Sequence, residues 1–153
     1  MKRQRGMTLV ELVIAIVIVG IAGAALYSAM AAIGGRSADP LLRQQSLALA
    51  EAYLEEILLQ DFLDPASATQ CPAPPALRQN YDNVCDYAGL VDNGARNAYG
   101  DALAGLEGYR VSVAVTPTAW NGLPASDVLA VLVTVRDPAG QELQLGGYRV
   151  RHD

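Results

Sequence analysis

The chain has 153 residues, enough for about one domain, and 52% of them are hydrophobic, slightly above the globular norm. The formal net charge is −5, and no lysine follows Arg5. This acidic composition argues against a general affinity for nucleic acid or anionic lipid. Outside residues 7–33 the chain has an ordinary globular composition, which excludes disordered, collagen-like and repetitive classes of protein. A multi-span membrane protein is excluded too, because no second apolar run reaches the ~18 residues of a spanning helix.

A basic leader followed by a long apolar segment opens the chain. Lys2, Arg3 and Arg5 come first, and residues 12–33 form a run of 22 uncharged positions. As a helix this run would be ~33 Å long, enough to cross a hydrocarbon core of ~30 Å. Because basic residues stay on the cytoplasmic side, we expect the remainder of the chain to be exported.

Glu11 is an unexpected charge at the start of this apolar segment. A carboxylate near bilayer depth costs on the order of 2–3 kcal/mol. Cleavage after Gly6 would place the new amine of Met7 four residues from Glu11, which is about one helical turn. The two charges could then neutralise each other, within one subunit or between neighbours, and the helix dipole favours a carboxylate in the first turn.

Residues 6–11, GMTLVE, with the basic leader before them and the apolar run after them, resemble the class III signal peptide of type IV pilins and pseudopilins. The resemblance implies that prepilin peptidase cuts after Gly6 and methylates Met7, and that Glu11 is the charge needed for assembly. The family usually has Phe in place of Met7, and its apolar helix often holds a central proline that is absent here. An ordinary secretory signal cleaved near residues 29–31 and an uncleaved anchor are the alternatives, and neither gives Glu11 a role.

The composition divides the chain into five segments. They are a leader at 1–6, a transmembrane and assembly helix at 7–35, an amphipathic helix at 36–62, a connection at 63–108 and a sheet at 109–153. Residues 34–40 predict an interruption, after which Asp39 suits an N-cap and Pro40 the first helical position. The second helix is expected to bury one stripe against the sheet and to turn its carboxylates to solvent. The predicted stripe is Leu47, Ala50, Tyr53, Leu54, Ile57 and Leu58, and the carboxylates are Glu51, Glu55 and Glu56.

The connection at 63–108 is long and rich in proline, asparagine, aspartate and glycine, so we expect it to be specially tied down. Cys71 and Cys85 are predicted to pair, because the exported side is oxidising. A 15-residue loop closed in this way gains about 3 kcal/mol. Two free buried thiols are the alternative. We expect no metal site and no cofactor: the one histidine, His152, is far from the cysteines, and the acidic residues of 82–101 lack the EF-hand spacing, although calcium there stays open.

Three strands are predicted after the connection. The first alternates from Tyr109 to Val115, residues 128–135 suit a central strand, and the turn at 137–140 leads to a last strand at 141–151. In this last strand the alternation of apolar residues shifts by one position, so we expect a β-bulge at residues 146–147. That bulge would place four arginines on the outer face of the sheet, either as a solvated face or as a docking surface for an acidic neighbour: Arg110, Arg136, Arg149 and Arg151.

These elements predict an α+β fold, a long N-terminal helix packed on a small antiparallel β-meander, as in type IV pilins. No pattern supports catalysis. Residues 36–58, followed by Asp64-Pro65 and two cysteines, are similar to minor pilins of the mannose-sensitive haemagglutinin (MSHA) type. A minor pilin that joins or primes a pilus is therefore the first hypothesis. A minor pseudopilin of a type II secretion system, or a tip subunit that binds DNA or a surface, is the alternative. The partners implied are prepilin peptidase, other pilin or pseudopilin subunits and the bacterial inner membrane, with the C-terminal domain in the periplasm and later on the cell surface.

Overall fold

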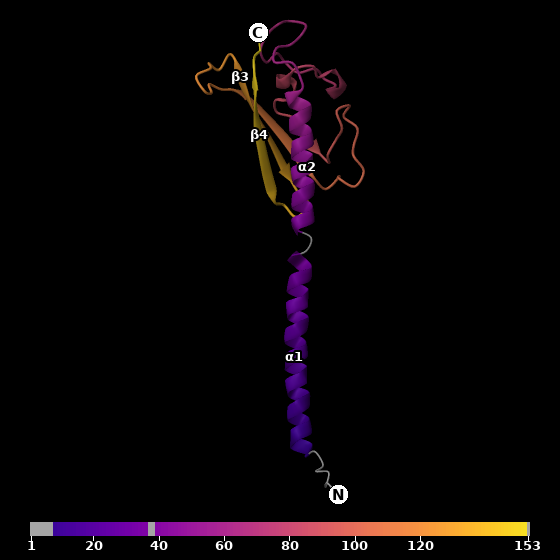
Figure 1. Ribbon diagram of the computed structural model, residues 1–153. Helices are drawn as coiled ribbons and strands as arrows, with labels where there is room; N and C mark the ends of the chain where they lie inside the picture. Colours follow the sequence, from indigo (N-terminus) through magenta and orange to yellow (C-terminus); the bar gives the residue numbers. More distant parts are fainter. Residues whose placement is uncertain (1–7, 37–38, 153) are drawn as a thin grey trace. The chain divides into compact units, whose positions relative to one another are not determined.

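The computed structural model describes residues 8–36 and 39–152. The chain forms two compact units, residues 1–41 and 42–153. The first is dominated by α1 (Leu9–Arg36), and the second contains most of α2 (Asp39–Leu58) together with all the strands (Figure 1). Of the residues 34–40, where an interruption is predicted, 34–36 belong to α1 and 39–40 to α2, and residues 37–38 lie outside the described residues.

Helix α2 buries one stripe in the second unit. Buried residues recur three and four positions apart, as expected for one face of a helix. They are Ala50, Tyr53, Leu54 and Ile57, each at most 9% exposed. The sequence placed Leu47 in this stripe, which is wrong: Leu47 is 40% exposed, and Leu49 is buried instead. Because each residue turns the helix by about 100°, a position between buried neighbours can lie well outside the stripe that they define.

The connection after α2 is ordered by three short elements. They are the 3₁₀ turns η1 (Arg78–Asn80) and η2 (Val84–Tyr87) and the strand β1 (Val91–Asn93). The sequence predicted no strand here, because three residues between turns are too few to display an alternating pattern. Strand β1 pairs antiparallel with β2, from Val91 opposite Ser112 to Asn93 opposite Arg110.

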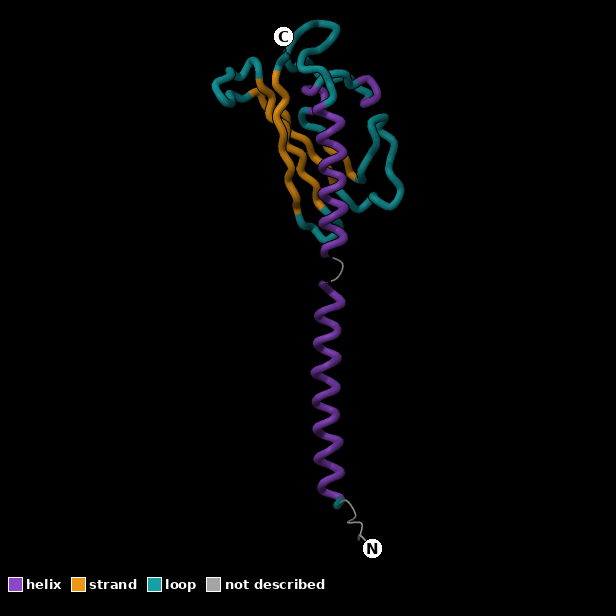
Figure 2. The backbone as a smooth tube through the Cα atoms, viewed as in Figure 1, coloured by secondary structure: helices purple, strands orange, loops and turns teal. Residues whose placement is uncertain are grey.

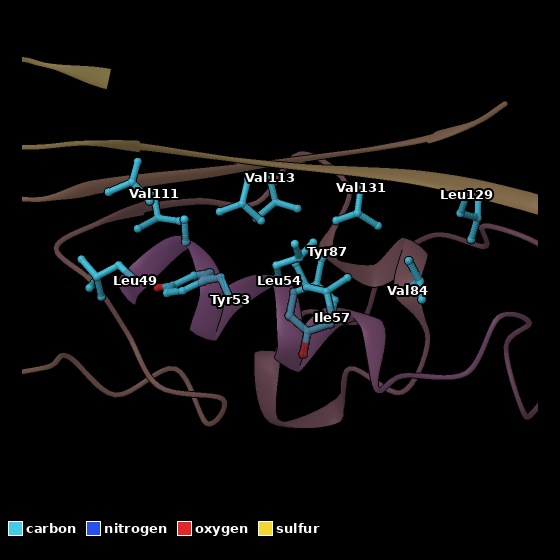
Figure 3. Packing of buried hydrophobic residues seen from close by; sticks show 14 of the residues in the cluster. Leu49, Tyr53, Leu54, Ile57, Val84, Tyr87, Val111, Val113, Leu129 and Val131 are labelled. Carbon is cyan, nitrogen blue, oxygen red and sulfur yellow. The ribbon is translucent and has the colours of Figure 1, made fainter. Parts of the chain in front are cut away.

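The sheet is an antiparallel meander in the order β1-β2-β3-β4. Its strands are orange in Figure 2. It continues with β2 (Arg110–Pro117), β3 (Val128–Arg136) and β4 (Glu142–Val150). The predicted α+β class and the three predicted strands are confirmed. Figure 3 shows Val111, Val113, Leu129 and Val131 of the sheet together with residues of α2. We call the side of the sheet that carries these valines the inner face and the opposite side the outer face.

The predicted bulge in β4 is absent. The pairing of β3 with β4 runs without interruption from Val128 opposite Val150 to Arg136 opposite Glu142. Gly147 therefore lies on the inner face, where a Cβ atom would be 3.1 Å from Leu58 Cδ1 and 3.4 Å from Leu54 Cδ1. The slip in apolar parity has a different cause: the inner face needs a glycine at 147 to let α2 approach, and Tyr148 points to the outer face.

Candidate functional site

The start of α1 is set by Thr8. Its carbonyl accepts the backbone N–H of Leu12 at 3.1 Å, and its Oγ1 accepts the backbone N–H of Glu11 at 3.3 Å. Thr8 is thus an N-cap that satisfies donors left without partners in the first turn. Sequence reasoning missed this role, although a Thr followed three residues later by Glu is a recognised signal for a helix start.

The capped start places Glu11 in the first turn of α1. The positive end of the helix dipole lies there, and it stabilises a carboxylate by about 0.3–1 kcal/mol. Glu11 is exposed, like every described side chain of α1 up to Met30. Gly6 and Met7, the residues expected to carry cleavage and methylation, lie outside the described residues.

The apolar part of α1 is long enough to cross a membrane. Within the described ranges, 8–36 and 39–152, one helix meets the length and composition of a span, at Leu9–Met30, and none of it is buried within the chain. Its large side chains are uncovered, from Leu9 at 79% exposure to Met30 at 64%. A helix that is apolar all round and unburied in its own chain requires an apolar environment from outside, either lipid or other helices.

The predicted disulfide is confirmed. Cys71 and Cys85 are bonded, with Cα atoms 4.8 Å apart. Cys85 lies in η2, and the side chain of Asn83 caps this turn by accepting the Cys85 N–H at 3.0 Å. Asp86 completes the capping box through the Asn83 N–H. The bond therefore joins the proline-rich start of the connection to a capped and buried turn.

A buried ion cluster holds the connection to α2 and β1. Arg78 Nη1 donates to Asp92 Oδ2 at 2.6 Å, and Arg78 Nη2 lies 3.2 Å from each carboxylate oxygen of Glu56. The side chains of Arg78 and Asp92 are 6% and 8% exposed. The guanidinium also lies 4.8 Å from the centre of the Tyr53 ring, within the range of a cation–π contact.

The tyrosines of this cluster complete its hydrogen bonds. Tyr53 Oη donates to Asp92 at 2.8 Å, and Tyr87 Oη donates to Glu56 at 2.8 Å. Burial raises the pKa of Tyr87, and the hydrogen bond to Glu56 raises it further. Burial likewise raises the pKa of Tyr53, in part offset by the N–H that Arg96 donates to its oxygen. Sequence reasoning placed Glu56 on the solvent side of α2 and singled out neither Arg78 nor Asp92, because nothing in the local pattern marks contacts between residues so far apart.

The four arginines expected on one face of the sheet are divided between its two faces. Arg110 and Arg136 are direct partners across β2 and β3, and both are exposed on the outer face. Arg149 pairs with the buried Leu129, so it lies on the inner face. Arg151 follows β4 and lines the same hollow as Arg149, beside Asp61 and Phe62. The four-arginine surface is therefore wrong, for the same reason as the bulge.

The oxygen-bearing residues of the connection hold its turns. Asn97 Oδ1 accepts the N–H groups of Tyr99 and Asp101, and Asp86 Oδ2 accepts that of Asp82. In the part of the chain that the structure describes, no cluster of three or more histidine, cysteine or acidic side chains could hold a metal ion. The hydrogen bonds of Asn97 and Asp86 are those that asparagine and aspartate ordinarily make in turns.

Comparison with known proteins bears on the first part of the chain. Residues 1–27 match the family model described as the prokaryotic N-terminal methylation motif. No curated protein and no solved structure matches the chain. The motif covers Gly6, Met7 and Glu11, and it indicates a type IV pilin or pseudopilin that prepilin peptidase processes. It ends within α1, so it carries no information about the α2 and sheet unit.

Proposed function

We propose that this protein is a minor pilin of the MSHA type, a structural subunit without catalytic activity. Prepilin peptidase removes residues 1–6 and methylates Met7. Helix α1 then holds the protein in the inner membrane, with residues 42–153 in the periplasm. From there the subunit enters a type IV pilus or primes its assembly.

The observation that carries this proposal is the combination found in α1. Its span from Leu9 to Met30 is apolar and unburied, and Glu11 lies in its first turn. A plain anchor has no use for this carboxylate, whereas a helix that leaves the bilayer to join others needs a partner for its own terminal amine. The methylation motif over residues 1–27 supports the same interpretation.

Helix α1 can lie in two apolar environments, the bilayer and the interior of a filament, and assembly moves it from the first to the second. In the bilayer, lipid covers its side chains, and in a filament the helices of other subunits replace lipid. Moving α1 from lipid into contact with the helices of other subunits costs little free energy, because both environments are apolar. A buried and unpaired amine would cost several kcal/mol, so the terminal amine of one subunit and Glu11 of its neighbour attract each other and fix the axial register.

The second unit provides a rigid periplasmic body. The core joins α2 to the sheet, and the disulfide and the Arg78 cluster hold the connection in place. The MSHA assignment is supported by the similarity of residues 36–58 and of the two following cysteines to minor pilins of that type. A pseudopilin would use the same membrane physics, so the two are distinguished by the filament that the subunit enters.

Intact mass and filament recovery test the proposal together. In a host with prepilin peptidase and an MSHA-type pilus, the mature protein should lack residues 1–6, carry one added methyl group and appear in sheared pili. Gly6→Leu should block cleavage, because the peptidase must approach the backbone there, while Arg43→Ala, at an exposed position of α2, is the matched control and should be processed normally. A mature terminus near residue 31 would overturn the pilin proposal. Cleavage after Gly6 with recovery only in a type II secretion complex would overturn the pilus assignment.

A further inference from the structure

Two arginines meet at one end of the outer face of the sheet. Arg110 and Arg136 are direct cross-strand partners, and like charges in that position are destabilising. Glu142 is the partner of Arg136 on β4, yet the ion pairs among the described residues involve neither arginine. Two exposed guanidinium groups in an acidic protein therefore remain available to a negatively charged partner.

The other end of the outer face is apolar. Trp120 and Tyr148 stack with ring centres 4.9 Å apart and planes within 12°, and they are 45% and 50% exposed. Leu132, between this pair and the arginines, is 40% exposed. Its cross-strand partners on β2 and β4, Ala114 and Gly146, are small. Side chains therefore project little from the middle of the outer face. The outer face thus changes from basic to apolar along the strands.

The exposed side of α2 has the complementary composition. Glu51 and Glu55 are exposed and lie one turn apart, and the small side chain of Ala52 lies exposed between them. Leu59 continues the last turn through an N–H bond to the carbonyl of Glu55 and is 83% exposed. From Glu51 onward this side of the helix changes from acidic to apolar, while the exposed Arg43 and Leu47 precede the carboxylates in the same row.

The two surfaces also agree in length. From Arg136 to Leu132 is four strand residues, or about 13 Å, and from Glu51 to Leu59 is eight helical residues, or about 12 Å. A helix laid along the strands can therefore place Glu51 on the arginines and Leu59 on Leu132 at the same time, with Glu55 between the two contacts.

From this charge and shape complementarity we infer that the outer face of the sheet of one copy binds the exposed side of α2 of a second copy. The two surfaces lie on different sides of the body, so the contact is head-to-tail and leaves a free surface at each end. Such a contact extends into an open chain of subunits. The inference rests on the proposed function, in which membrane-held copies come together through α1, and it adds the contact between their bodies.

The contact is small, and it acts through local concentration. It involves part of one face of a short sheet, and we expect it to bury less than the roughly 800 Å² per partner of a standard interface. Copies held in one membrane by α1 have a high effective concentration, which makes a weak contact measurable. The test therefore uses the full-length protein in membranes.

A charge exchange with a photo-crosslinker tests the inference. The crosslinking amino acid replaces Leu132, and a matched control carries it at Tyr99, which is 75% exposed and lies on neither surface. Variant A is R110E/R136E, and variant B is E51R/E55R. In A alone or B alone the two surfaces carry the same charge, so the crosslink between copies seen in the unaltered protein should be lost. In a mixture of A and B, the acidic outer face of A meets the basic α2 of B, and the basic outer face of B meets the acidic α2 of A. Both contacts are attractive, so the crosslink should return and connect A to B.

The crosslinked peptides identify the contact. Mass mapping should join position 132 of one copy to residues 47–59 of the other. A crosslink that persists in A and in B alone overturns the inference, as does its failure to return in the mixture or a crosslink to another protein in place of a second copy. Cleavage after Gly6 and recovery in sheared pili are measured on the same samples. If these are normal while the crosslink is absent, the inference fails and the proposed function stands.

Discussion

Arg78 Nη1 donates to Asp92 Oδ2 at 2.6 Å, and both side chains are buried, at 6% and 8% exposure. The pair joins η1 to β1, two elements of the connection that the core alone would hold loosely. A buried charge that loses its partner is costly, because the remaining ion keeps its desolvation penalty.

Arg78→Ala should therefore lower the free energy of unfolding by about 3–5 kcal/mol. Urea unfolding of the full-length protein in detergent, followed by the fluorescence of Trp120, the one tryptophan of the sequence, measures it. Arg43→Ala, at an exposed position of α2, is the control and should change stability by less than about 0.5 kcal/mol. Equal stability of the two variants would mean that the cluster does not hold the connection.

Tyr87 makes the stability of the body depend on pH. Burial first, and then Glu56, raise its pKa in the folded state above the unfolded value of about 10. The contribution of Tyr87 to the free energy of unfolding is complete below about pH 10. It is lost as the pH rises from there through the folded pKa, because the unfolded state releases the proton first. The urea concentration at the unfolding midpoint should therefore be lower at about pH 11 than at about pH 9. Tyr87→Phe should reduce this slope, and Tyr99→Phe, at an exposed position, should leave it unchanged.

The sequence predicted the elements that repeat and missed the contacts that do not. The long apolar helix follows from its uncharged run, and the amphipathic helix and the three longer strands follow from their apolar patterns. The disulfide follows from two cysteines on an exported chain. The cluster of Arg78, Glu56 and Asp92 joins positions 14 to 36 residues apart, and no local pattern marks such a contact. Glu56 has the same helical spacing as its solvent-facing neighbours, and only the folded connection gives it a partner.

Gly147 explains why the sequence of β4 suggests a bulge that the sheet does not have. A parity slip between Leu145 and Tyr148 has two explanations: an inserted residue, or a position where the inner face requires no side chain. The structure has the second, because the space beside Gly147 is filled by Leu54 and Leu58 of α2. Periodicity alone does not separate the two, since the helix that fills this space is distant in sequence.

Gly147→Val should destabilise the body, and Gly146→Val is its matched control. A Cβ at 147 would meet Leu58 at 3.1 Å, whereas one at 146 has ordinary contacts of 3.4 Å and more on the exposed outer face. We expect a loss of about 1–3 kcal/mol for Gly147→Val and less than about 1 kcal/mol for Gly146→Val. The reverse order in urea unfolding would contradict the register of β3 and β4.

The Cys71–Cys85 bond should contribute about 3 kcal/mol to the free energy of unfolding, as expected for a loop of about 15 residues. The double variant C71S/C85S removes it without leaving a single buried thiol. Limited proteolysis should then cut within residues 63–77 while the sheet stays protected, since α2, β2 and β3 supply most of the core residues. The unaltered protein treated with reductant is the control and should give the same fragments. Cleavage within the strands instead would show that the bond supports the whole body.

Glu11 should be needed for assembly and dispensable for insertion. Glu11→Val removes the carboxylate from the first turn of α1 and makes the helix more apolar, so cleavage and membrane retention should be normal. In a filament, however, the amine of Met7 would be buried without its partner, at a cost of several kcal/mol. We expect processed protein in the membrane fraction and a loss of at least about tenfold from sheared pili, since 1.4 kcal/mol already corresponds to tenfold.

Two controls separate the charge of Glu11 from the cap that it shares with Thr8. Thr8→Val removes the Oγ1 acceptor of the Glu11 N–H and keeps the carboxylate, so it should weaken the helix start by about 1 kcal/mol and leave recovery in pili largely intact. Glu11→Asp keeps the charge on a shorter side chain and should assemble better than Glu11→Val. Recovery is measured by immunoblot of sheared pili, beside a blot that separates processed from unprocessed protein. If Glu11→Val enters pili as well as the unaltered protein, the carboxylate is not the assembly determinant, and the apolar packing of α1 alone must provide it.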